Sequence, residues 1–316
     1  MIFTAINVGT NSTKALFVRI NDAGWEELSR ELEVTGLGEG LASGCLSEAA
    51  MVRTEQAIMK LVEQGKKLGS SSFWLTGTQA LRQAANSQEF QRRLAQRNLK
   101  LQILTGDQEA ALSFAGITSN FSGSTPILAF DLGAGSLELM AGQNKLDKAV
   151  SLPLGAGLLT ENFFNSDPPA PAERQALENY IADILKEYTF PGYKLLIGVG
   201  GTVTVLCQLA LSQREYSRDF HGEKLAYSTV LRLYREISSL SLNQRTSLPG
   251  LENPRRAKIA VAGVGVVKKL MEIYQAPELI VSEAGILDGM IEAVCAGEQL
   301  ADHRIRTVLT EREILI

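Results

Sequence analysis

Residues 6–12 of the chain read INVGTNS, and residues 130–136 read FDLGAGS. Each stretch follows a short apolar run and leads into a second one, the pattern of two buried strands joined by a tight turn. Because glycine tolerates a positive φ in such a turn, each stretch predicts a β-hairpin. The copies agree at an Asn or Asp, a Gly and a Ser. We therefore interpret them as an internal repeat rather than as two unrelated hairpins.

The spacing of the two copies predicts two similar domains. They start 124 residues apart (131 − 7), and a length of 316 residues suits two domains. Residues 119–126 read SNFSGSTP, a composition typical of a linker. We place the domains at residues 1–124 and 125–299. The tail, residues 300–316, is expected to return to the first domain, with a helix over residues 304–316.

Between these landmarks, apolar runs of strand length alternate with helical patterns, and a plausible helix N-cap stands at Ser47. This alternation predicts an α/β fold. Strands are expected at residues 73–76, 101–104, 195–197 and 279–281, and helices at 47–65, 88–96, 108–115, 203–211, 255–274 and 284–296.

The composition excludes several classes of protein. A net charge of −4 argues against a broad nucleic-acid-binding face. No signal peptide and no apolar run of membrane-spanning length is recognisable. The three cysteines never form a C-x-x-C spacing, which argues against a disulfide framework or a zinc site, and the two histidines make a Ser-His-Asp triad hard to assemble. A cytoplasmic location is expected.

Three glycine turns could bind an anion, because backbone N–H groups can point inward where no Cβ intervenes. They are residues 9–12, 133–136 and 198–202, and the third also opens a helix, whose N-terminus favours negative charge. The alternative for residues 198–202 is a turn needed only for helix packing.

Three side chains could take part in chemistry, and local sequence leaves each with a simpler alternative. Asp131 follows a buried strand and could face a phosphate-bound Mg²⁺, or it could cap its own turn. Glu109 stands in the first turn of an expected helix, where it could be functional or could simply complement the helix dipole. Arg82 could clamp a phosphate or could be a solvated helix charge.

Motifs along nearly the whole chain, taken in order, resemble those of the Ppx/GppA phosphatases, which are exopolyphosphatases and guanosine-pentaphosphate phosphohydrolases. Residues 6–12 resemble D-x-G-[ST]-N-S, residues 78–82 (TQALR) resemble T-x-A-[LM]-R, residues 104–110 (LTGDQEA) resemble I-S-G-x-x-E-A, and residues 130–138 (FDLGAGSLE) resemble D-I-G-G-G-S-x-E. Counterparts follow in order at residues 151–155, 198–202, 221–222 and 281–285.

The resemblance implies a duplicated ribonuclease-H-like (actin-like ATPase) fold of two domains with an interdomain cleft. It implies Mg²⁺-assisted removal of a terminal phosphate from inorganic polyphosphate or guanosine pentaphosphate. Glu109 matches the catalytic glutamate that activates water, Asp131 the metal- and phosphate-associated aspartate, and Arg82 the arginine that steadies the phosphate chain. The implied metal ligands are Asp131, Glu109 and, as a neutral substitute for an aspartate, Asn7. The implied phosphate-binding residues are Gly9, Thr10, Asn11, Ser12, Gly133, Ala134, Gly135, Ser136, Gly200, Gly201 and Thr202.

The chain departs from the family pattern at five positions. Asn7 stands for an Asp and Ala134 for a Gly; Leu158 and Leu287 stand for basic residues, and Lys258 for an Asp. Besides an enzyme acting on polyphosphate or guanosine pentaphosphate, two further hypotheses stay open, the first of them suggested by Asn7, Leu158 and Leu287. One is a non-catalytic binder of guanosine nucleotides or polyphosphate, and the other is an actin-fold sugar kinase, against which residues 106–110 argue. No nucleic-acid or membrane partner is expected, and a homodimer stays open.

Overall fold

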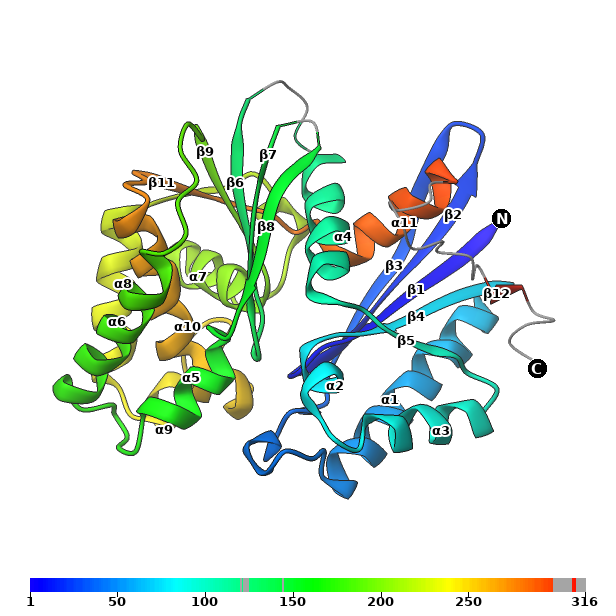
Figure 1. Ribbon diagram of the computed structural model, residues 1–316, viewed down its shortest axis with the longest axis horizontal. Helices are drawn as coiled ribbons and strands as arrows, with labels where there is room; N and C mark the ends of the chain where they lie inside the picture. Colours follow the sequence, from blue (N-terminus) through cyan, green and yellow to red (C-terminus); the bar gives the residue numbers. More distant parts are fainter. Residues whose placement is uncertain (120, 122–124, 144, 298–308, 311–316) are drawn as a thin grey trace. The chain divides into compact units, whose positions relative to one another are not determined.

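The computed structural model describes the chain except for residues 120, 122–124, 144, 298–308 and 311–316 (Figure 1). The described residues form two compact units. Unit 1 comprises those of residues 1–120 and 286–316, and unit 2 comprises those of residues 121–285. Each unit is built on its own mixed β-sheet, so no continuous sheet runs through both copies of the repeat.

Unit 1 has a sheet in the order β12-β4-β1-β2-β3, with β5 paired to β4. Strands β1, β2 and β3 form an antiparallel meander, whereas β4 and β5 run parallel to β1 and to β4. Its elements are β1 (Ile2–Val8), β2 (Ser12–Asn21), β3 (Gly24–Val34), a 3-10 turn η1 (Leu41–Ser43), α1 (Glu48–Lys67), β4 (Ser72–Gly77), α2 (Gln79–Gln83), α3 (Ser87–Gln96), β5 (Leu101–Ile103), α4 (Gly106–Ser119), α11 (Ile286–Ala296) and β12 (Leu309–Thr310).

The two faces of this sheet carry separate apolar cores, because successive side chains of a strand point to opposite faces. Ile6 and Val8 of β1 join the core formed with α1 and α3. Phe3 and Ala5 join the core formed with α4 and α11. Asn7, in step with Phe3 and Ala5, therefore belongs to the face that α4 and α11 cover. Helix α1 begins as expected, with the Ser47 Oγ accepting a hydrogen bond from the N–H of Ala50 at 3.2 Å.

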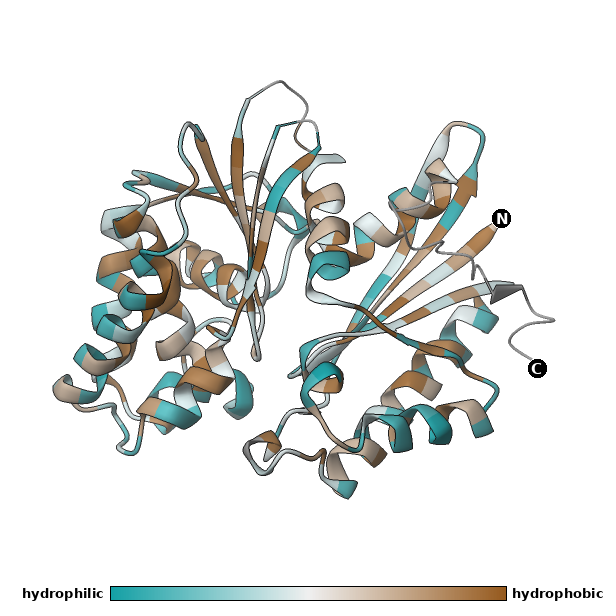
Figure 2. Cartoon of the chain, in the orientation of Figure 1, coloured by the Kyte–Doolittle hydropathy of each residue, from teal (hydrophilic) through white to brown (hydrophobic). Residues whose placement is uncertain are grey.

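Unit 2 has a sheet in the order β10-β11-β9-β6-β7-β8. Leu128, Phe130 and Leu132 of its central strand pack into one large apolar core. Its elements are β6 (Ile127–Leu132), β7 (Leu137–Gly142), β8 (Leu146–Leu152), α5 (Ala156–Phe163), α6 (Pro171–Leu185), β9 (Leu195–Val199), α7 (Gly201–Leu211), η2 (Arg218–Phe220), β10 (Lys224–Ala226), α8 (Tyr227–Ser239), α9 (Leu242–Arg245), α10 (Pro254–Ile273) and β11 (Glu278–Val281). Figure 2 shows the resulting contrast, with apolar residues concentrated in the strands and polar ones on the outer sides of the helices.

The repeat extends to the register of the two hairpins. Asn7 pairs with Lys14 across β1 and β2, and Asp131 pairs with Glu138 across β6 and β7. Both pairs are related by the same shift of 124 residues (131 − 7 and 138 − 14). Beside the hairpins, β4 lies parallel to β1 as β9 lies parallel to β6. The two units therefore share one topology, strand for strand, around their turns.

The C-terminal side differs from the sequence expectation. Residues 286–297 group with unit 1, although the sequence analysis assigned them to the second domain. The reason is the apolar face of α11, which buries Ile286, Leu287 and Met290 in the core of unit 1. A Cβ at Gly289 would lie 1.8 Å from the Leu112 carbonyl oxygen, so α11 and α4 cross at very close range.

The helix expected over residues 304–316 is wrong at the two residues of that range that the structure describes. Leu309 and Thr310 form strand β12, which pairs antiparallel with β4, while the rest of residues 304–316 lies outside the described residues. At the expected linker, α4 ends at Ser119 and β6 begins at Ile127. Among the described residues, no helix combines the length and apolarity needed to cross a membrane. The three cysteines are free thiols.

Candidate active site

The first two glycine turns have the same closing hydrogen bond. The Gly9 N–H donates to the Ser12 carbonyl at 2.9 Å, and the Gly133 N–H donates to the Ser136 carbonyl at 3.0 Å. These glycine N–H groups therefore serve the turn itself. The next two N–H groups of each turn, those of Thr10 and Asn11 and those of Ala134 and Gly135, have no hydrogen-bond partner among the described residues. Each turn thus presents two adjacent donors of the kind that binds an oxyanion.

The carbonyl oxygens of these turns, which would repel a phosphate, are held by neighbouring backbone. The N–H groups of Thr35 and Gly36 both donate to the Asn11 carbonyl, at 3.0 and 2.9 Å. In unit 2 the first turn of α5 does the same: Gly157 and Leu158 donate to the Ala134 carbonyl at 2.8 and 3.0 Å. Both turns are therefore braced by neighbouring backbone N–H groups.

The third turn is built by a close approach of Gly200 to β6. With φ at 109°, Gly200 would place a Cβ 2.6 Å from the Leu132 carbonyl oxygen and 3.2 Å from an Asp131 carboxylate oxygen. Only glycine fits here. The N–H groups of Gly201 and Thr202, the first of α7, have no partner among the described residues, as expected for helix-terminal donors. Glycine is needed at position 198 for a separate reason, because a Cβ there would lie 2.5 Å from the Phe130 ring.

The Thr202 side chain serves packing. A Cβ at Gly263 of α10 would lie 2.5 Å from the Thr202 Oγ, and the residue is only 9% exposed. Both interpretations of residues 198–202 therefore hold, each for different atoms. Close packing explains Gly198 and the Thr202 side chain. The N–H groups of Gly201 and Thr202 are open donors.

Glu138, a second carboxylate beside Asp131, ends a motif quoted in the sequence analysis but was given no role there. Glu138 lies directly opposite Asp131 in the hairpin, and opposite residues of an antiparallel pair share a face of the sheet. Ser151 of β8 continues the row and donates to the Glu138 carboxylate at 2.8 Å. The seven-residue spacing of Asp131 and Glu138 across a tight turn was the available signal, because it makes the two residues a cross-strand pair.

In unit 1 the equivalent row has the opposite character. Asn7 replaces the aspartate and Lys14 the glutamate. Asn7 is 8% exposed, and its amide oxygen accepts a hydrogen bond from the Thr76 hydroxyl at 2.9 Å. The hairpin row of unit 1 thus carries one positive charge, whereas that of unit 2 carries two carboxylates.

Glu109 and Arg82, two of the candidate residues named from the sequence, are brought together in unit 1. Glu109 lies in the first turn of α4 and is 7% exposed, and its carboxylate pairs with the Arg82 guanidinium at 2.6 Å. The same arginine donates to the Leu104 carbonyl at 2.9 Å and to the Gln79 side chain at 3.0 Å. In this arrangement Arg82 orients Glu109, and a direct grip on phosphate by Arg82 stays a prediction.

Arg256 is a further cation that the sequence analysis passed over. It lies in the first turn of α10, half-buried, and has no ion pair among the described residues. Burial lowers the pKa of its guanidinium, against the opposing effect of Glu252 and Glu283. Of the five departures from the family pattern, Leu158 lies in the first turn of α5 beside the second glycine turn, Lys258 is exposed on α10, and Leu287 is 2% exposed in the core of unit 1.

A magnesium ion suits part of this arrangement. The described residues contain no group of three or more His, Cys, Asp or Glu side chains arranged to hold a metal. Mg²⁺, however, is commonly bound by one or two carboxylates together with waters and substrate phosphates. The Asp131–Glu138 pair meets that smaller requirement.

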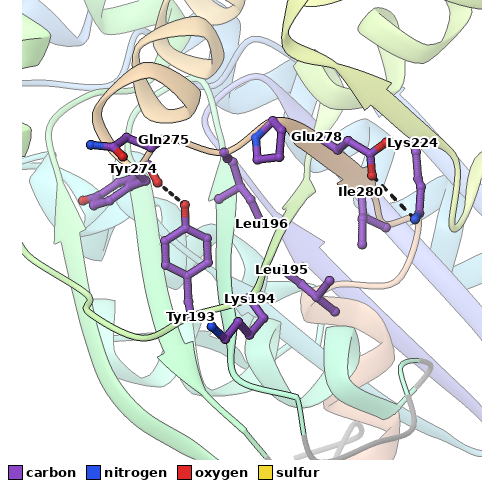
Figure 3. Close-up of a pocket in the computed structure, with 11 residues that line it drawn as sticks. Tyr193, Lys194, Leu195, Leu196, Lys224, Tyr274, Gln275, Glu278 and Ile280 are labelled. Atoms are coloured by element: carbon purple, nitrogen blue, oxygen red, sulfur yellow. Dashed lines mark hydrogen bonds and ion pairs between the residues drawn. The ribbon is translucent and has the colours of Figure 1, made fainter.

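A pocket of about 360 Å³ in unit 2 lies away from the third turn (Figure 3). Its lining includes Tyr193, Leu195 and Leu196 at the start of β9, whereas the turn with Gly200 follows the end of that strand. At roughly 3.3 Å per residue, the five-residue strand separates the two by about 15 Å. The pocket is therefore not the place where the predicted phosphate donors converge.

Comparison with known proteins gives consistent results. The model of the Ppx/GppA phosphatase family matches residues 16–295. Exopolyphosphatase 2 of Mycobacterium tuberculosis is 28% identical over 308 residues, which cover 90% of this chain and 96% of that protein. Guanosine-5'-triphosphate,3'-diphosphate pyrophosphatase of Vibrio parahaemolyticus is 25% identical and matches 97% of this chain but only 62% of its own length.

Solved structures agree. The crystal structure of the Aquifex aeolicus Ppx/GppA family member has a TM-score of 0.82 at 26% identity, covering 95% of this chain and 99% of that one. An exopolyphosphatase structure from Cytophaga hutchinsonii has a TM-score of 0.87 at 22% identity, covering 95% and 99% of the two chains, and shows the same fold. The expected α/β class and duplicated ribonuclease-H-like (actin-like ATPase) fold are thereby confirmed.

Proposed function

The chain belongs to the Ppx/GppA phosphatase family, and we propose that it is an exopolyphosphatase, releasing the terminal phosphate of inorganic polyphosphate. One observation carries this proposal above the others. The first two glycine turns each present two adjacent N–H donors without a partner among the described residues, at positions related by the internal repeat. Such pairs suit the repeated, identical oxyanions of a phosphate chain better than one isolated anion.

Polyphosphate is placed before guanosine pentaphosphate because the exopolyphosphatase is the more similar of the two relatives, at 28% against 25% identity. The exopolyphosphatase of Mycobacterium tuberculosis is matched over 96% of its length. The Vibrio pyrophosphatase is 25% identical and is matched over 62% of its length. Hydrolysis of guanosine pentaphosphate is the second candidate, because it would use the same phosphate-binding turns.

The proposed reaction is attack of a water oxygen on the terminal phosphorus. The bond from that phosphorus to the bridging oxygen breaks, the proton of the water passes to the Glu109 carboxylate, and the products are orthophosphate and a chain one unit shorter. The ion pair at 2.6 Å with Arg82 supports this role, since it holds the carboxylate in one orientation. The backbone donors would bind the charge that the oxygens carry in the transition state.

Magnesium is part of the proposal. Asp131 and Glu138 would hold it together with phosphate oxygens, and the ion would supply charge neutralisation to the leaving chain. The neutral Asn7 adds no charge to such a site, so metal binding should depend on the presence of substrate. A cytoplasmic location is also proposed, which the three free thiols support.

The test is release of orthophosphate from long-chain polyphosphate, guanosine pentaphosphate and ATP, measured side by side with and without Mg²⁺. We expect release from polyphosphate to dominate. Faster release from guanosine pentaphosphate would move the assignment to the second candidate. Binding of either compound with no release would favour the non-catalytic binder, and release only from ATP would contradict the proposal.

A further inference from the structure

The loop after β11 contacts the first turn of α7 through the side chain of Glu283. The carboxylate of Glu283 accepts a hydrogen bond from the Thr204 hydroxyl at 3.0 Å. Thr204 in turn follows the third glycine turn, and its own N–H donates to the Gly200 carbonyl at 3.2 Å. Glu283 is therefore one hydrogen bond removed from the backbone that offers the Gly201 and Thr202 donors.

The backbone of Glu283 is anchored independently of its carboxylate. Its N–H donates to the His221 Nδ1 at 3.2 Å, so that ring nitrogen acts as the acceptor. Its carbonyl accepts a hydrogen bond from the Arg218 guanidinium at 3.2 Å. The Phe121 ring packs against the same imidazole, with 4.9 Å between the two ring centroids. The direction of the Glu283 side chain is thus set from outside the turn.

The residues on either side of Glu283 are rigidly placed as well. Ser282 is 1% exposed, its N–H donates to the Gly198 carbonyl at 2.8 Å, and its hydroxyl donates to the Ala284 carbonyl at 2.7 Å. The loop is therefore tied to the end of β9, where the third turn begins. On the other side of the turn, Thr202 packs against Gly263. Helix α7 is consequently braced at its first turn from two directions.

We propose that Glu283 is a positioning residue for the third phosphate-binding turn, acting through its hydrogen bond with Thr204 to hold the Gly201 and Thr202 N–H groups in place for a phosphate. This inference rests on the proposed function, because it assumes that the turn binds substrate phosphate. The hydrogen bond matters more than the charge: a carboxylate close to the phosphates would by itself oppose their binding.

The kinetic test uses a conservative and a disruptive variant. Glu283→Gln keeps an acceptor for Thr204, whereas Glu283→Ala removes it. We expect Glu283→Ala to raise KM for polyphosphate about three- to tenfold with little change in kcat, as for the loss of one hydrogen bond. Glu283→Gln should stay close to wild type. Thr204→Val should match Glu283→Ala, and the double variant should be no worse than either single one.

Three kinetic outcomes would overturn the proposal. A lower KM in both Glu283 variants would show that the charge repels substrate and that positioning is unimportant. Unchanged KM in Glu283→Ala, or strictly additive effects in the double variant, would show that the contact does not support the turn. Exposed Glu215→Ala, on the loop that follows α7, is the matched control and should leave KM unchanged.

A second measurement does not depend on activity. Hydrogen exchange of the amides in residues 199–206 should be faster in Glu283→Ala than in wild type, and near wild type in Glu283→Gln. If wild type releases no phosphate from polyphosphate, the proposed function fails while this measurement still decides the positioning role. If exchange in residues 199–206 is the same in all variants, positioning fails, whatever the wild-type activity.

Discussion

Glu109 is the residue on which the proposed hydrolysis depends most directly. Glu109→Gln keeps the size of the side chain and an acceptor for Arg82 but removes the proton-accepting carboxylate. We expect turnover on polyphosphate to fall by about 10²–10⁴, the range for a single general base, while KM changes little. The exposed neighbour Asp107→Asn is the control. Near-normal phosphate release in Glu109→Gln would remove Glu109 from the role.

Asn7 offers a test of how the proposed metal would be held. Asn7→Asp keeps the oxygen that accepts from Thr76 and adds a negative charge on the α4 and α11 face of the sheet. If position 7 lies near the metal, a Mg²⁺ titration of phosphate release should shift to lower concentration. Asn21→Asp, at the exposed end of the same hairpin, controls for added charge. Coincident titrations for wild type and Asn7→Asp would show that position 7 is not near the metal.

At the scale of elements, the N-terminus of α5 lies in direct backbone contact with the second glycine turn. A Cβ at Gly155 would lie 2.2 Å from the Gly135 carbonyl carbon and 2.4 Å from the Ser136 nitrogen, all backbone atoms that cannot rotate away. Gly155→Ala should displace the turn, cost about 1–3 kcal/mol of stability and raise KM for polyphosphate.

Gly157 provides a graded comparison in the same helix. A Cβ there would lie 3.1 Å from the Ala134 carbonyl oxygen, a tight contact but not an overlap. Gly157→Ala should therefore have a clearly smaller effect than Gly155→Ala in both thermal unfolding and KM. Equal effects of the two substitutions would mean that loss of glycine flexibility, and not the contact with the turn, is responsible.

At the scale of the whole chain, the return of α11 to unit 1 depends on a buried ion pair. Asp288 is fully buried, and its two oxygens accept from the Arg30 guanidinium of β3 at 2.7 and 3.2 Å. The pKa of Arg30 is raised: burial opposes the charge, but Asp288 and Glu27 outweigh it. Asp288→Ala removes the shorter ion pair of Arg30 and leaves the 3.2 Å pair with Glu27, so it should destabilise unit 1 by up to about 3–5 kcal/mol.

Tryptophan fluorescence can measure this loss. The two tryptophans of the chain, Trp25 and Trp74, both lie in unit 1, so denaturant unfolding followed by their emission reports that unit. Glu63→Ala, which breaks an exposed pair with Lys67, is the control and should leave the stability of unit 1 nearly unchanged. An Asp288→Ala protein as stable as the control would show that apolar packing alone holds α11.

The sequence by itself determined the features that depend on neighbours in the chain. Both hairpins, the N-cap at Ser47 and the strand and helix alternation follow from local periodicity and turn chemistry, and all are present. The internal repeat predicted a shared topology because the two copies obey the same local rules. The residues of the candidate site could also be named from their motifs, although their roles stay predictions.

Only the tertiary structure decided which distant residues meet. Arg82 reaches Glu109 across 27 positions and Arg30 reaches Asp288 across 258, and no local pattern encodes such pairings. The assignment of α11 to unit 1 was missed because its apolar sequence pattern is compatible with packing on either sheet. The close fit of Gly289 against Leu112 selects the sheet of unit 1. Glu138 was missed for a related reason: its place beside Asp131 comes from strand register, which pairing across the sheet determines and composition does not.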